Sequence, residues 1–99
     1  MKIKKLSVRE YSEILYALAH PLRLKIVCGL SKKGVCNVGE MTKRLVAAQP
    51  TVSRHLNILK NAGVVKGYRK GAQICYKAEC PQALKIIKSM DIDFCKEKI

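Results

Sequence analysis

The sequence predicts a small, mainly α-helical domain that carries one β-hairpin. Apolar residues recur at helical spacing along most of the 99 residues, and the pattern changes to that of two short strands only between residues 64 and 77. The chain contains no internal repeat and no low-complexity linker. Because this length fits one small domain, we expect a single domain over residues 1–99.

The N-terminal part of the chain predicts two helices that meet at a proline. Ser7, followed by Glu10 three residues later, has the pattern of a capping box and would begin a helix over residues 8–19. Pro21 suits the first turn of a second helix, which we expect to run to about Leu30. The residues at 31–34, Ser-Lys-Lys-Gly, are typical of a loop.

The middle of the chain predicts two shorter helices joined by a tight connection. The first places Val38, Met41 and Leu45 inward, and residues 47–49 make the connection. The next helix begins at Pro50 and ends at about Asn61, where Asn-Ala-Gly is a strong C-terminal stop. Its buried stripe would be Val52, Leu56 and Leu59.

The C-terminal part predicts a β-hairpin and a last helix. Residues 64–68 and 74–77 alternate like strands, and the turn between them carries two cations at its tip. Pro81 begins a helix that would run to about Lys96. The predicted order is therefore α-α-α-α-β-β-α. Two short helices joined by a tight turn and followed by a basic hairpin are the order of a winged helix-turn-helix.

The charge of the chain indicates an anionic partner. Lys and Arg number 20 against 7 Asp and Glu, which gives a net charge of +13, and no acidic residue lies between Glu40 and Glu79. An ordinary solvated surface mixes both signs, although an idle basic surface is the simpler alternative. Since the acid-free stretch contains the predicted helix pair and hairpin, we expect double-stranded DNA as the partner, rather than an acidic membrane surface or an acidic protein.

The helix from Pro50 has the outward residues that reading DNA requires. Once its apolar residues turn inward, hydrogen-bonding side chains remain for base edges and phosphates, and the cations of the hairpin tip would reach the flanking backbone or the minor groove. For His55 the alternative is a surface side chain without a role. The residues expected to contact DNA are Gln49, Thr51, Ser53, Arg54, His55, Asn57 and Lys60 on the helix and Arg69 and Lys70 on the hairpin.

Several other classes of protein have little support. The chain shows no nucleophile–base pair and no phosphate-binding loop, so we expect neither an enzyme nor a cofactor. No apolar run approaches the roughly 20 residues that span a bilayer, and the N-terminus lacks the apolar region of a signal peptide. We therefore expect a cytoplasmic protein with no membrane partner. Five cysteines, an odd number, argue against a disulfide framework as the basis of the fold.

The chain resembles the ArsR/SmtB family of bacterial and archaeal repressors over about residues 14–96. The resemblance lies in the segments 19–26 (Ala-His-Pro-Leu-Arg-Leu-Lys-Ile), 49–65 (from Gln-Pro-Thr-Val-Ser-Arg-His-Leu to Gly-Val-Val) and 68–71, and in Tyr76. It implies a homodimeric repressor whose first and last helices build the dimer interface. It also implies that an inducer, by binding or modifying the protein, releases it from its operator.

The resemblance argues against the metal sites of the family. Metal- and arsenic-sensing members often carry Glu-Leu-Cys-Val-Cys-Asp-Leu at the third helix, whereas this chain has Asn37 and Gly39 at the two cysteine positions. The other common site uses Asp and His on the last helix, and here Asp91 and Asp93 have no histidine partner on that helix. We therefore expect no metal site of either kind.

The cysteines instead resemble those of thiol-based members that sense persulfides or oxidants. Such proteins have one cysteine in the second helix and one near the end of the last, and Cys28 and Cys95 occupy these places. The expected inducer is a reactive sulfur or oxidant species that bridges this pair. Two alternatives stay open: Cys28 is a core residue, or Cys36, Cys80 and Cys95 form a thiolate site for arsenite, cadmium or zinc. Cys75 is interpreted as structural.

Overall fold

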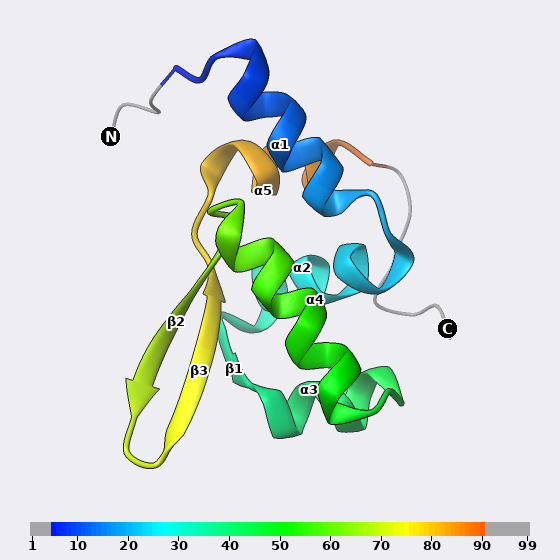
Figure 1. Cartoon of the computed structure of the whole chain (residues 1–99), viewed down its shortest axis with the longest axis vertical. Helices are drawn as coiled ribbons and strands as arrows, with labels where there is room; N and C mark the ends of the chain where they lie inside the picture. Colours follow the sequence, from blue (N-terminus) through cyan, green and yellow to red (C-terminus); the bar gives the residue numbers. More distant parts are fainter. Residues whose placement is uncertain (1–4, 91–99) are drawn as a thin grey trace.

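The elements of the computed structural model follow the predicted order with one strand added. The structure describes residues 5–90. The helices are α1 (Val8–Leu18), α2 (Pro21–Lys33), α3 (Val38–Leu45), α4 (Gln49–Asn61) and α5 (Pro81–Ser89), and the strands are β1 (Val35–Asn37), β2 (Val65–Lys70) and β3 (Gln73–Ala78) (Figure 1). The mainly α-helical fold with a β-hairpin, the arrangement of a winged helix-turn-helix, is confirmed.

The predicted start signals of the first two helices are present. Ser7 Oγ accepts a hydrogen bond from the Glu10 amide at 3.1 Å, and the Ser7 amide donates to Glu10 Oε1 at 3.0 Å, which completes the capping box. The His20 Nδ1 accepts from the Leu22 amide at 3.0 Å, and Pro21 opens α2. In the part of the chain that the structure describes, no single helix is long and apolar enough to cross a membrane, and the α1–α2 pair is bent by 100°.

Three parts of the structure differ from the prediction by more than a residue or two. Helix α2 continues through residues 31–33, where a loop was expected, and ends at Gly34, whose φ is 90°. Strand β1 was not predicted, because three residues are too few for a recognisable alternation; it is held by pairing with β3, in the sheet order β1-β3-β2. The last helix was expected to reach Lys96, and α5 runs to Ser89, while residues 91–99 lie outside the described residues.

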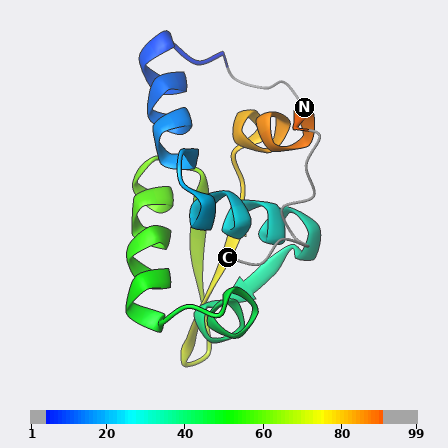
Figure 2. The same ribbon diagram turned by 90° about the vertical axis from the view of Figure 1, so that its right-hand side faces the viewer.

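The core lies where α2 meets the other helices. In Figure 2, α1 and α4 line one side of the molecule and α5 the other, with α2 between them, and α2 contacts α1, α4 and α5. The largest completely buried side chains come from α2, α4 and the segment that enters the hairpin: Val27, Val52, Leu56, Leu59 and Val64. This packing fixes the face that α4 turns away from the core.

The hairpin of β2 and β3 forms a wing that projects from the helical body toward the end of the molecule that holds α3 (Figure 1). The two strands pair antiparallel, with Gly67 opposite Tyr76 and Arg69 opposite Ile74. A Cβ at Gly67 would lie 3.3 Å from the Tyr76 ring, so the close approach favours glycine. Gly71, with a φ of 65°, makes the turn at the tip.

Candidate nucleic-acid interface

Helix α4 presents a polar face to solvent because its buried residues form one stripe. Val52, His55, Leu56 and Leu59 are buried, at the spacing of one helical face. Thr51 and Ser53 are half-buried at the edges of that stripe. The predicted contact residues that are exposed are Gln49, Arg54, Asn57 and Lys60. The prediction of a hydrogen-bonding and cationic outward face therefore agrees with the geometry of the helix, except at His55.

The expected outward position of His55 is wrong. Its side chain is 8% exposed and belongs to the buried stripe. The reason is visible in the sequence, since His55 follows Val52 by three residues and precedes Leu59 by four, which is the spacing of one helical face. The expected outward position follows from the polarity of histidine and neglects the place of His55 in the helical period.

His55 is buried because α2 supplies a partner for it. The guanidinium Nη1 of Arg23 lies 3.1 Å from His55 Nδ1, and Arg23 Nε donates to the Ala17 carbonyl at 2.6 Å. The His20 ring lies beside that of His55, with centroids 4.4 Å apart. Burial, followed by the charges of His20, Arg23 and Arg54, lowers the pKa of His55 below 6.5. This network was not anticipated from the sequence.

The tip of the wing carries the two cations that the sequence predicted there. Arg69 and Lys70 end β2 and are exposed. Nearer the body, the Lys66 ammonium lies 5.6 Å from the centre of the Tyr68 ring, and the Tyr68 hydroxyl donates to Glu79 Oε1. That hydrogen bond raises the pKa of Tyr68. Glu79, the acidic residue nearest the wing in the sequence, is thus hydrogen-bonded at the base of the wing, away from the basic tip.

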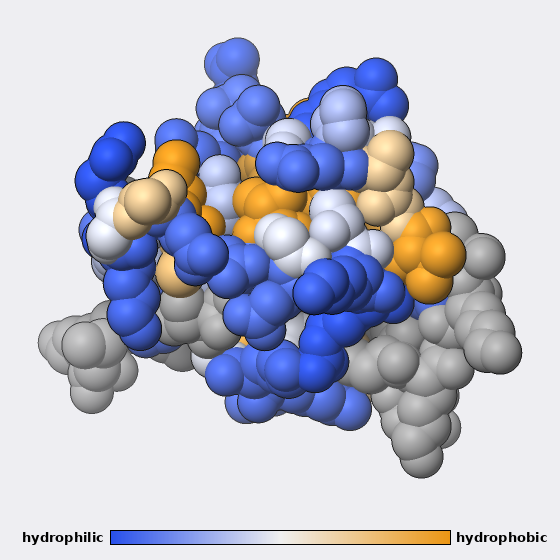
Figure 3. Space-filling view, turned by 90° about the horizontal axis from the view of Figure 1, so that it is seen from below, coloured by the Kyte–Doolittle hydropathy of each residue, from blue (hydrophilic) through white to orange (hydrophobic). Residues whose placement is uncertain are grey.

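The wing and the helix pair share one end of the molecule. Figure 3 looks at this end from below and shows hydrophilic side chains over most of the surface, around a smaller apolar area. The basic residues of the acid-free stretch come from α3, α4 and both wing strands; they are Lys43, Arg44, Arg54, Lys60, Lys66, Arg69, Lys70 and Lys77, all exposed. The arrangement suits contact with a polyanion.

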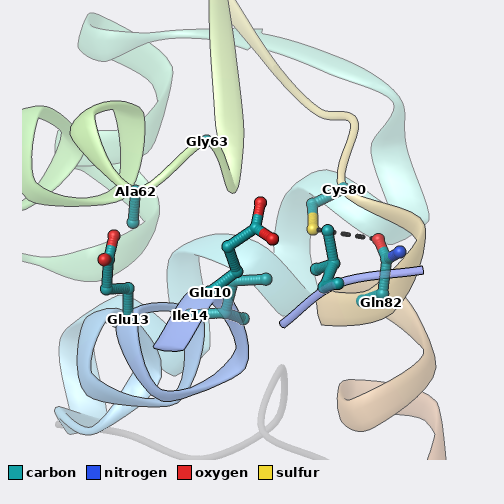
Figure 4. Close-up of a pocket in the computed structure, with 8 residues that line it drawn as sticks. Glu10, Glu13, Ile14, Ala62, Gly63, Cys80 and Gln82 are labelled. Atoms are coloured by element: carbon teal, nitrogen blue, oxygen red, sulfur yellow. Dashed lines mark hydrogen bonds between the residues drawn. The ribbon is translucent and has the colours of Figure 1, made fainter. Parts of the chain in front are cut away.

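The cysteines are dispersed over the described part of the chain. Cys28 is buried on α2, and Cys75 is buried on β3, which agrees with a structural role for the latter. Cys80 is half-buried before α5, and its thiol lies 3.6 Å from Gln82 Oε1 (Figure 4). The side chain of Cys36 and all of Cys95 lie outside what the structure describes, so the pairing of Cys28 with Cys95 stays a prediction.

The described residues contain no group of three His, Cys, Asp or Glu side chains able to hold a metal ion. Cys80 instead lines an open pocket of about 220 Å³ together with Glu10 and Glu13 of α1 and Gln82 of α5, and the carboxylate of Glu13 points toward Ala62 (Figure 4). Asn37 has a structural task, since its Oδ1 accepts from the Glu40 amide at 2.8 Å and caps α3.

Comparison with known proteins identifies relatives over most of the chain. The family model of bacterial regulatory proteins of the arsR family matches residues 20–66, which hold α2, α3, α4 and the start of β2. The biofilm growth-associated repressor of Agrobacterium fabrum is 37% identical over 86 residues, which cover 87% of this chain and 73% of that protein.

Solved structures agree with the sequence comparison. The transcriptional repressor PagR of Bacillus anthracis is 38% identical over 90 residues, which cover 91% of this chain and 90% of that protein. Its crystal structure superimposes with a TM-score of 0.77 over 82% of this chain and 92% of that one. A structure described as reduced HlyU, from Vibrio cholerae, has a TM-score of 0.76 at 28% identity, over 81% of this chain and 83% of that one.

Proposed function

This chain belongs to the ArsR family of transcriptional repressors, and on that premise we propose that it binds operator DNA as a homodimer and is released by thiol oxidation. The family consists of DNA-binding regulators, so the prediction that the chain is not an enzyme is confirmed.

The observation that carries the DNA-binding proposal is that the wing and the helix pair that contains α4 lie at the same end of the molecule (Figure 1). The exposed face of α4 offers Gln49, Arg54 and Asn57, which are side chains suited to base edges and phosphates. The wing tip adds Arg69 and Lys70. Ala48 has no side-chain oxygen to cap α4 and Pro50 has no N–H, so the amides of Gln49 and Thr51 in the first turn are left for a phosphate.

The proposal of a homodimer is supported by an exposed apolar face on α1. Ile14 and Leu18 point into the core, whereas Val8, Leu15 and Tyr16 are 88%, 50% and 75% exposed, and Tyr11 is 39% exposed. So many large apolar side chains on the surface of one helix are costly in water and mark an interaction surface. A second copy of the chain, packed through α1 and the last helix, would cover them. Two copies of α4 would then meet two half-sites of one operator.

The proposed release is an oxidation of Cys28 and Cys95. In the first step, one cysteine thiolate attacks the outer sulfur of a hydropersulfide, R–S–S–H, takes that sulfur and releases R–SH. In the second step, the other thiol attacks the inner sulfur of the resulting Cys–S–S–H and expels hydrogen sulfide. The product is a disulfide between the two cysteines. With a peroxide, the two thiols give up two electrons and two protons, and hydrogen peroxide is reduced to two waters. Either route ties α2 to the segment that follows α5.

Two observations support the thiol proposal. Helix α2, which carries Cys28, packs against α5, so a covalent link between α2 and the end of the chain would act on a helix of the proposed dimer interface. In addition, the HlyU neighbour is described in a reduced form. A 100-fold loss of operator affinity would require the free energy of DNA binding to be about 2.7 kcal/mol less favourable in the oxidised state than in the reduced state.

The test begins with duplex DNA selected by the reduced protein from a randomised library. Binding to the selected duplex is measured by fluorescence anisotropy for the wild type, Cys28→Ser, Cys95→Ser and Cys80→Ser, each before and after hydropersulfide, peroxide, arsenite or zinc. We expect hydropersulfide or peroxide to release the wild type and the Cys80→Ser variant, while Cys28→Ser and Cys95→Ser stay bound. Mass spectrometry should find a peptide that links Cys28 to Cys95.

Two results would contradict the proposal in different ways. If no sequence is enriched by the selection, the operator-binding proposal fails. If a sequence is enriched but arsenite or zinc releases the protein and Cys80→Ser abolishes that response, the thiolate metal(loid) site is the switch instead.

A further inference from the structure

We infer that His55 is a positioning residue, which holds α4 in its reading orientation through Arg23 rather than by touching DNA. This inference rests on the proposed operator binding and assigns a task to the one predicted contact residue that the fold buries. A side chain that is 8% exposed on the inward stripe of α4 has no route to a base edge while the helix keeps its packing.

The contacts form a continuous chain from α1 to α4. The carbonyl of Ala17, in the last turn of α1, accepts from Arg23 Nε at 2.6 Å, and Arg23 Nη1 lies 3.1 Å from His55 Nδ1. Arg23 is itself buried, at 8% exposure, in the first turn of α2. The Arg23 guanidinium thus links the middle of α4, the proposed reading helix, to α1, the helix whose exposed apolar face we assign to the dimer interface.

The chemistry of the two side chains fixes the direction of the hydrogen bond. A guanidinium has donors but no acceptor and keeps its proton at any ordinary pH, so His55 Nδ1 must accept. The imidazole is therefore neutral, with its proton on Nε2. A protonated His55 would carry a hydrogen on Nδ1 that points at a buried cation, and the contact would open.

The surroundings of His55 favour this neutral form. Its ring faces His20, which precedes α2, and Arg23 of α2, and its neighbour on α4 is Arg54. All three are basic. A buried Arg23 that lost this acceptor would be left with an unpaired donor in the core, which is among the costlier defects in a folded protein. The orientation of α4 therefore depends on an unprotonated acceptor at one position.

Three substitutions separate positioning from simple packing. In His55→Asn the side-chain oxygen can take the place of Nδ1, because both atoms are bonded to the same carbon of the side chain. In His55→Gln the oxygen lies one bond further, nearer the place of Nε2. His55→Phe keeps the ring and removes the acceptor. Circular dichroism and thermal melting confirm folding, and affinity is measured on the DNA selected by the wild type.

We expect His55→Asn to bind within about threefold of the wild type and His55→Phe and His55→Gln to bind at least about tenfold more weakly, as loss of one hydrogen bond to a charged group predicts. All variants should keep the wild-type slope of log affinity against log salt, since no phosphate contact is removed. Wild-type affinity should also fall on acidification below pH 6.5 more than that of His55→Asn.

Three outcomes would overturn the inference. Equal affinity of all four folded proteins would show that the contact does not position α4. Equal loss in all three variants, with a salt slope reduced by about 0.9, would show that His55 contacts a phosphate directly. A His55→Asn variant as weak as His55→Phe, at unchanged slope, would show that ring packing rather than the acceptor matters. Failure of the wild type to select any sequence would instead refute the proposed operator binding.

Discussion

Asn37 joins the wing to the helix pair. Its Nδ2 donates to Oε1 of Gln73, at the start of β3, at 3.1 Å, while its Oδ1 caps α3. The unpredicted strand β1 makes this possible, because it pairs with β3 and places Asn37 opposite Cys75. The residue that the sequence resemblance aligns with a cysteine of metal-sensing members thus ties the wing to α3, the first helix of the pair.

Removal of the Asn37 side chain should destabilise the protein more than removal of its partner. Asn37→Ala loses the cap of α3, worth about 1 kcal/mol, and the link to the wing, worth roughly another 1 kcal/mol. Gln73→Ala loses the link alone and should cost less than about 1 kcal/mol, because Gln73 is exposed. Urea unfolding measures both. An Asn37→Ala variant no less stable than Gln73→Ala would show that the cap contributes nothing.

Val46 lies in the turn between α3 and α4 in a conformation that suits glycine. Its φ and ψ are 51° and 49°, and it is 90% exposed. The left-handed region costs an ordinary residue roughly 1–2 kcal/mol, and glycine loses about 0.5–1 kcal/mol of chain entropy on folding. Val46→Gly should therefore raise the free energy of unfolding, by up to about 1.5 kcal/mol. The control Ala47→Gly, at a residue without a positive φ, should lower it; a destabilised Val46→Gly would refute the strain.

The cations of α4 and the wing should each account for part of the salt dependence of DNA binding. If Arg54, Arg69 and Lys70 each neutralise one phosphate, alanine at any of them reduces the slope of log affinity against log salt by about 0.9. Lys5→Ala is the charge-matched control, since Lys5 is exposed and precedes α1, whose N-terminal end lies at the opposite end of the molecule from the wing tip (Figure 1). Equal slopes for Lys5→Ala and the wing variants would place the DNA elsewhere.

Acidification should reduce stability through His55. The pKa of His55 in the fold lies below 6.5, so between the two values the unfolded chain binds a proton that the folded chain does not. The free energy of unfolding should therefore be unaffected by this group well above pH 6.5 and fall as the pH drops from there toward the folded value. Urea titrations at several pH values should show a smaller fall in His55→Asn. An identical pH dependence in both proteins would contradict the buried, neutral imidazole.

Much of the fold was predictable because its signals are local. The Ser7–Glu10 capping box, the proline starts of α2 and α5, and the stop at Gly63, whose φ is 77°, are set by residues a few positions apart. Strand β1 was not predictable in this way, since it depends on pairing with a strand some 40 residues later.

The candidate site was predictable where exposure follows the helical period. The outward positions of Arg54, Asn57 and Lys60 follow from the apolar stripe of α4. The buried network of Arg23 and His55 did not follow, because it joins two polar residues that are 32 positions apart in the chain. The period alone would have placed His55 inward, but its partner on α2 is fixed by the packing of the helices.

The most direct test of the account is a hydroxyl-radical footprint of the reduced protein on the DNA that it selects. A homodimer that reads with α4 and the wing should protect two half-sites related by two-fold symmetry, with centres about one helical turn, ~34–36 Å, apart. Two chains should bind each duplex at saturation. A single asymmetric footprint from one chain, or uniform protection without preferred positions, would contradict the account.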